Sequence, residues 1–177
     1  MVVGMFYVLL TLVIILFGFR ITQYMLISDT VEDALAASNL ASAVIDIREF
    51  GKSHKVQIQD PENAFLLYRE ALCHNLLLDE YLNTTNQEVL ASKVEIEEYI
   101  VYNVSDAVVE IYVLDESGQI KKYDTAAPGQ VYTPDGVCVE ATTVYSRISF
   151  QVNGLFDQKI GASKEKSVDI VRCEIEQ

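Results

Sequence analysis

Residues 17–38, "FGFRITQYMLISDTVEDALAAS", join an uncharged apolar run to an amphipathic segment. Residues 19–50 contain neither Gly nor Pro, the residues that most often interrupt helices. The simplest prediction is therefore one helix over residues 2–50. At 1.5 Å per residue such a helix is about 70 Å long, more than twice the thickness of a membrane core.

A break near Ser28 is the alternative, because Asp29 followed by Glu32 could form a local capping pair. A broken helix would make the first part a plain membrane tether, whereas a continuous one would make the second part a stalk. Gly51, between Arg48 and Lys52 in the surrounding sequence, is typical of a helix C-terminus.

The first 19 residues carry no charged side chain, and Thr11 is their one clearly hydrophilic residue. As a helix they reach about 28 Å, just enough to cross a hydrocarbon core. A cleaved signal peptide would need a basic start and small residues at its cleavage site. Phe17, Phe19 and Arg20 stand there instead, which favours a retained single-pass anchor over residues 1–27. A signal peptide and a buried core helix are the alternatives.

Arg20 is the only basic residue near either end of this span, and the positive-inside rule alone would place the following domain in the cytoplasm. One Arg is little evidence. The expectation adopted is a cell-membrane protein with its domain on the extracytoplasmic side.

Residues 28–50 are predicted to continue the helix as an amphipathic stalk. Mostly small residues share one stripe of it: Val31, Ala34, Leu35, Ser38, Ala41, Ser42 and Ile45. Small residues allow another helix to approach closely. We expect residues 31–47 to pack on the protein's own sheet and residues 2–27 to pack against other molecules. The candidate packing residues are Val13, Leu16, Tyr24, Ala34, Ala37, Ser38, Ala41 and Ser42.

Residues 51–177 are predicted to form one domain that begins with a second helix. Asp60 is its candidate N-cap, Pro61 its first residue and Glu62 the acid that favours its positive end. An apolar face follows at three- and four-residue spacing, comprising Phe65, Tyr68, Leu72 and Leu76.

From Lys93 onward the pattern alternates as strands do. One face of the first strand is predicted to hold Val94, Ile96, Glu98, Ile100 and Tyr102. Further strands are expected over residues 108–114 and 119–123, within 137–154 as one or two strands, and over 167–175. Helices followed by a run of strands indicate an α+β fold with an antiparallel sheet.

The formal net charge of −13 argues against a nucleic-acid partner, which would need clustered Lys and Arg. His54 lies in a polar connector, and Cys73 and His74 diverge by about 100° on a helix, so no metal site is predicted. No cofactor motif, small-molecule substrate site or catalytic constellation was identified, and the expectation is a protein without enzymatic activity.

The three cysteines cannot form a fully paired set within the chain. Cys138 and Cys173 both fall in predicted strands and could form one disulfide. Buried free thiols are the alternative.

The sequence of residues 5–47, "MFYVLLTLVIILFGFRITQYMLISDTVEDALAASNLASAVIDI", resembles pilin-like proteins, and most closely the TadE/TadF-like pseudopilins of tight-adherence (Tad-type) pili. The resemblance implies an envelope protein whose apolar helix lies in the lipid bilayer before assembly. It also implies partners among other pilin-like subunits or a membrane platform protein of a pilus or secretion apparatus.

Prepilins usually carry a basic leader ending in Gly and a Glu five residues into the mature helix. Here Gly4 is the candidate glycine, and Leu9 is the fifth residue after it. We therefore carry over no processing site. Two other hypotheses remain: a membrane-tethered acidic module that binds a ligand or protein, and an anchored hydrolase.

Overall fold

The structure, a computed structural model of the chain, describes residues 2–43, 56–86, 90–105, 107–154 and 158–170. Within these ranges lie two helices and one antiparallel sheet in the order β3-β2-β1-β4-β5. The α+β fold with a long N-terminal helix and a second amphipathic helix is as predicted. The elements are α1 Val2–Ser42, α3 Pro61–Asn75, β1 Glu95–Val104, β2 Val109–Leu114, β3 Ile120–Ala126, β4 Thr142–Asn153 and β5 Lys159–Ile170.

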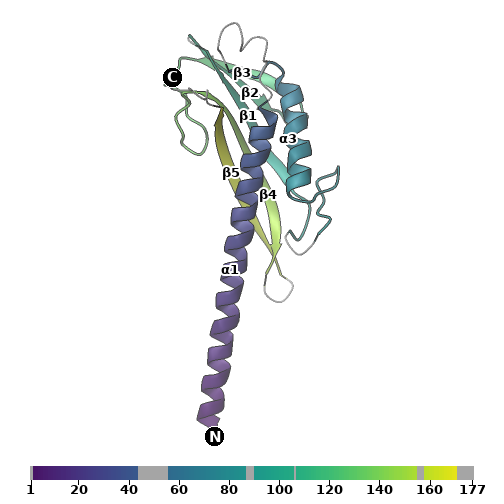
Figure 1. Cartoon of the computed structure of the whole chain (residues 1–177), viewed down its shortest axis with the longest axis vertical. Helices are drawn as coiled ribbons and strands as arrows, with labels where there is room; N and C mark the ends of the chain where they lie inside the picture. The colour runs from purple at the N-terminus through teal and green to yellow at the C-terminus, as the bar shows by residue number, and fades with distance from the viewer. Residues whose placement is uncertain (1, 44–55, 87–89, 106, 155–157, 171–177) are drawn as a thin grey trace, which may run out of the picture.

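Both helices lie on the same face of the sheet, and α1 projects far beyond the domain as a rod (Figure 1). The last part of α1 packs on α3, β5 and β4, and the main hydrophobic core lies between the helices and the sheet. Its largest fully buried side chains include Leu35 of α1, Tyr68 and Leu72 of α3, and Tyr99 of β1. The opposite face of the sheet carries a smaller cluster, closed by Val131 and Val139 from the connection between β3 and β4.

Helix α1 is continuous through Ser28 and Asp29, so the predicted continuation of the apolar run into a stalk is confirmed. The predicted end at Phe50 is wrong, because the helix ends at Ser42 and Ala43 is not helical. Residues 44–50 and the expected C-terminal signal at Gly51 lie outside the described residues.

The second helix begins as predicted. Asp60 is the N-cap of α3, and its carboxylate accepts a hydrogen bond of 3.0 Å from the backbone N–H of Asn63. Pro61 occupies the first turn together with Glu62. The predicted apolar face is also found, since Tyr68, Leu72 and Leu76 are buried and Phe65 is half-buried against Tyr99.

One prediction for β1 is wrong in an instructive way. The pairing with β4 shifts between Ile96 and Glu98, so Glu97 is an extra residue in a β-bulge. An extra residue reverses the alternation of faces. Ile96 therefore packs in the core under the helices, whereas Ile100 and Tyr102 lie on the opposite face with the smaller cluster.

The last strands agree with the predictions in part, since β4 lies within the predicted range 137–154 and β5 overlaps the predicted range 167–175. β4 is one strand that begins at Thr142, and Cys138 precedes it in an isolated bridge with Tyr132. β5 begins at Lys159, earlier than predicted, and pairs with β4 along its whole length. Residues 171–177 are outside the described part of the chain.

Asn103 fixes the connection that enters α3. Its side-chain amide accepts from the Ile58 N–H at 2.9 Å and donates to the Ile58 carbonyl at 2.8 Å. Both Asn103 and Ile58 are buried, so the amide satisfies two backbone groups that water does not reach. The segment before α3, which is neither helix nor strand, is thereby bonded to β1 through both backbone groups of Ile58.

We expect Asn103→Ala to reduce the free energy of unfolding by about 2 kcal/mol or more, because it leaves both Ile58 backbone groups unsatisfied. Thermal unfolding of the full chain in non-ionic detergent, followed by the fluorescence of its ten tyrosines, measures the change. Gln119→Ala, at an exposed turn position, is the control. Equal stability of the two variants would contradict the role given to Asn103.

Candidate functional site: the apolar rod and its attachment

The first half of α1 is an apolar surface that the other described residues of the chain leave uncovered. Every residue from 3 to 19 is exposed, including the predicted packing residues Val13 and Leu16. The hydroxyl of Thr11 donates to the Tyr7 carbonyl at 2.9 Å, which satisfies the one hydrophilic side chain within the helix itself. We call residues 3–19 the rod.

The rod has the length and composition of a membrane span. Among the described residues, α1 is the one helix that is both long enough and apolar enough to cross a bilayer. None of its most apolar stretch of 18 residues is buried in the molecule. The alternative of a buried core helix is therefore wrong for this part of the chain. A helix satisfies its backbone groups internally, which is the condition for entering a hydrocarbon layer.

The second half of α1 packs against the domain. Val31 and Leu35 are completely buried in the core, and of the predicted packing residues Ala34, Ser38 and Ser42 are buried as well. Ala37 and Ala41 are exposed, so the small-residue stripe points only partly inward. Tyr24 is half-buried where the rod meets the domain.

A buried polar contact, which the sequence did not reveal, fixes this half of α1 on the sheet. The Asn39 side chain donates to the Lys166 carbonyl of β5 at 2.8 Å and accepts from the Ser146 hydroxyl of β4 at 2.8 Å. Asn39 and Ser146 are both fully buried. Because each group has a directional partner, sliding or rotating the helix would break bonds that water could not replace.

An ion-pair cluster lies one to two turns before this contact. The Glu32 carboxylate accepts from Lys166 Nζ at 2.7 Å and from Lys164 Nζ at 3.3 Å. These hydrogen bonds, with the two positive charges, lower the pKa of Glu32 below its usual value. The edge strand β5 thus reaches Glu32, which lies outside the small-residue stripe of the stalk.

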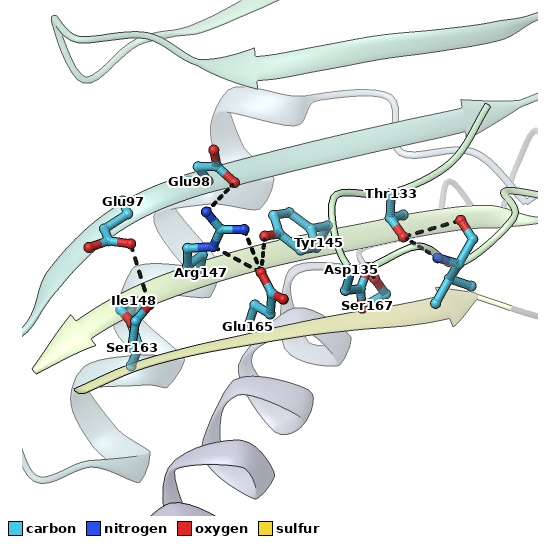
Figure 2. Close-up of polar contacts among 11 residues, drawn as sticks. Glu97, Glu98, Thr133, Asp135, Tyr145, Arg147, Ile148, Ser163, Glu165 and Ser167 are labelled. Atoms are coloured by element: carbon cyan, nitrogen blue, oxygen red, sulfur yellow. Dashed lines mark hydrogen bonds and ion pairs between the residues drawn. The ribbon is translucent and has the colours of Figure 1, made fainter.

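Figure 2 shows a second polar network, on the sheet face away from the helices. Glu165 Oε2 accepts from Tyr145 at 2.8 Å and from the Arg147 guanidinium at 2.9 and 2.6 Å, and Arg147 also lies 3.8 Å from Glu98. The bonds lower the pKa of Glu165, whereas burial and the adjacent carboxylate raise the pKa of Tyr145. Glu165 therefore stays ionised and Tyr145 protonated near neutral pH, as in a structural cross-strand network.

The remaining candidate groups are dispersed. His74 is exposed at the end of α3, and the neighbouring Cys73 thiol donates to the Asp79 carbonyl at 3.3 Å. Burial raises the pKa of Cys73, which disfavours the reactive thiolate. In the part of the chain that the structure describes, no three His, Cys, Asp or Glu residues come together as a metal site would require. His54 lies outside that part.

Cys138 is half-buried beside Tyr132. Cys173 lies outside the described residues, so the Cys138–Cys173 disulfide stays a prediction.

Comparison with known proteins gave no match: no family model, no curated protein and no solved structure is recognisably similar to this chain.

We expect Asn39→Leu to destabilise the protein by about 2 kcal/mol, because it leaves the Ser146 hydroxyl and the Lys166 carbonyl without their partner. Tyrosine-fluorescence melting in detergent measures the effect. Ala37→Leu, on the exposed face of the same helix, adds a comparable side chain and should change stability by no more than about 0.5 kcal/mol. If Asn39→Leu and Ala37→Leu unfold at the same temperature, the polar contact does not hold α1 on the sheet.

Glu32→Gln should reduce stability at neutral pH by about 1 kcal/mol or less, since the pair is partly solvated. A lowered folded pKa contributes stability that is complete above the unfolded value near 4.5 and is lost as pH falls through the folded value. The difference between wild type and Glu32→Gln should therefore vanish in acid and shrink in high salt. Asp29→Asn serves as the control; a pH-independent difference would contradict this origin.

Proposed function

We propose that this protein is a non-enzymatic, single-pass envelope protein of the pilin-like class, acting as a minor subunit or assembly factor of a Tad-type pilus or secretion apparatus. The observation that carries the proposal is the division of one continuous helix: residues 3–19 are exposed and apolar, and residues 31–42 pack on an α+β domain. The resemblance of residues 5–47 to TadE/TadF-like pseudopilins supports the same class.

The division suits a subunit that is stored in a membrane and then packs against other helices. The rod has no charge from residue 3 to residue 19, so a bilayer accepts it without an energetic penalty for burying ions. Domain and rod move together, because the helix between them is unbroken and its packed half is bonded to β4 and β5. A platform protein or another subunit that holds the rod would thereby also orient the domain.

A membrane-tethered binding module is the second candidate, and the acidic surface of the chain is compatible with it. In that case the anchor would only localise a domain that folds by itself, starting near Ser53. Val31 and Leu35 of α1 are instead fully buried in the domain core. A domain cut free of α1 would expose that part of its core, which favours the pilin-like proposal over a detachable tether.

Crosslinking within the membrane tests the proposal. Val13→Cys or Leu16→Cys, in a chain with Cys73, Cys138 and Cys173 replaced by Ser, should form disulfide or bismaleimide adducts with a second protein in membranes of the native host. Both positions are exposed on one side of the rod, three residues apart.

The control for this experiment is Tyr123→Cys, on the exposed surface of β3 far from the rod. Adducts from the rod positions, absent from the control, are the expected outcome. Exclusive monomer at Val13 and Leu16, in membranes that retain the protein after alkaline extraction, would contradict the subunit role and leave the plain tether.

A further inference from the structure

The end of the β4–β5 hairpin lies beside α1 at the point where the rod leaves the domain (Figure 1). The Tyr24 hydroxyl donates to the Asn153 carbonyl at 3.5 Å, and Asn153 is paired directly with Lys159 on β5. Ile160, paired with Val152, follows Lys159. Side chains from two distant parts of the chain are thus brought to one level along the α1 axis.

That level is set by the rod. Tyr24 follows Phe19, the last residue of the uncharged run, by five positions, or about 7 Å along a helix. The polar layer of a bilayer extends roughly 5–8 Å beyond the hydrocarbon core on each side. When the rod occupies the core, Tyr24, Asn153 and Lys159 come to the headgroup layer.

The side chains at this level have the chemistry of a membrane interface. Tyr24 is an aromatic residue with a polar end, the type enriched where membrane meets water. Ile160 is 45% exposed on the hairpin. Between α1 and the hairpin lies an apolar groove of about 210 Å³, lined by Tyr24, Ile27, Phe150, Val152, Ile160 and Ala162, among others.

Charge at this level is complementary to a lipid surface. Arg20 is the only charged residue among the first 28, and Lys159 is exposed at the start of β5. The chain as a whole carries a formal charge of −13, yet the acids of α1 begin only at Asp29, farther from the rod. Asp157 of the hairpin connection is outside the described residues. Lipid phosphates attract Lys and Arg at this depth.

We propose that the hairpin end and the adjoining turn of α1 form a second membrane contact, with Ile160 and Tyr24 resting in the headgroup layer and Arg20 and Lys159 pairing with lipid phosphates. The inference rests on the proposed membrane insertion of the rod. The Gly154 N–H donates to the Gln158 carbonyl at 2.6 Å, and a Cβ at Gly154 would meet that oxygen at 2.8 Å. This bond joins the two ends of the hairpin strands just beyond the contact. In the proposed arrangement the domain meets the membrane at two points, the rod and the hairpin.

A depth measurement tests the contact. The full chain, with its native cysteines replaced by Ser, is labelled with an environment-sensitive fluorophore at Ile160→Cys and reconstituted in vesicles of phosphatidylglycerol and phosphatidylcholine. Nitroxide lipids carrying the spin label at the headgroup or deep in the acyl chain act as quenchers. Lys159→Cys is a second labelled position, which lies outside the groove but removes one of the two proposed cations, whereas Ile160→Cys keeps both. Val13→Cys reports the rod, and Tyr123→Cys reports the opposite edge of the sheet.

Headgroup nitroxide should quench the labels at residues 160 and 159, deep nitroxide should quench the label at residue 13, and neither should quench the label at residue 123. If residues 160 and 159 behave like residue 123 while residue 13 is quenched, the second contact is overturned and the insertion of the rod stands. If residue 13 is not quenched either, the proposed insertion itself fails.

The charge part of the contact has its own readout. Arg20→Glu should shift the equilibrium between molecules whose hairpin contacts the lipid and molecules tilted as a whole away from it by about fivefold or more towards the tilted state, seen as reduced headgroup quenching at residue 160. The shift should be larger in vesicles containing phosphatidylglycerol than in phosphatidylcholine alone. If the chain with Arg20 and the Arg20→Glu variant are quenched equally, with and without phosphatidylglycerol, the proposed pairing with lipid phosphates is wrong.

Discussion

The packing of residues 31–42 of α1 against β4 and β5 is the contact on which the rest of the structure depends. Val31 and Leu35 contribute apolar burial to it, which is strong but without direction. Asn39 supplies the direction through its bonds to Ser146 and Lys166. Because α1 has no break, this contact also fixes the axis along which the rod leaves the domain.

The parts of the fold that could be predicted are those encoded by neighbouring residues. The start of α3 follows from Asp60 and Pro61, and the continuity of α1 follows from the absence of Gly and Pro across Ser28. The missed features depend on residues far apart in the chain. Asn39 meets Ser146 across 107 positions and Glu32 meets Lys166 across 134, so no local pattern marks either contact. The bulge at Glu97 has one local sign, because the adjacent Glu97 and Glu98 interrupt the apolar–polar alternation, and the prediction of a single continuous face passed over it.

The two faces of the sheet are stabilised in different ways. Under the helices the core is apolar, with Tyr99 and Val101 of β1 against α3 and its neighbours. On the other face the bulge places Glu98 beside Arg147, which also binds Glu165 across the strand pair. Cross-strand ion pairs of this kind are partly solvated and contribute little each. That face also carries the smaller apolar cluster, whereas the larger core lies on the helical face, which is the face that carries the rod.

Most side chains of the rod are bulky as well as apolar, and this limits how well the rod can distinguish one partner helix from another. Close approach of helices in a bilayer depends on small residues, because lipid tails are as apolar as Leu and give no hydrophobic preference for a helix partner. Between residues 3 and 19 only Gly4 and Gly18 lack a side chain, and no Ala or Ser is present. The rod therefore has little means of selecting one helix over another. Under the proposed pilin-like role, selectivity for a partner would then reside in the domain, whose position relative to the rod is fixed by Asn39 and the buried residues around it.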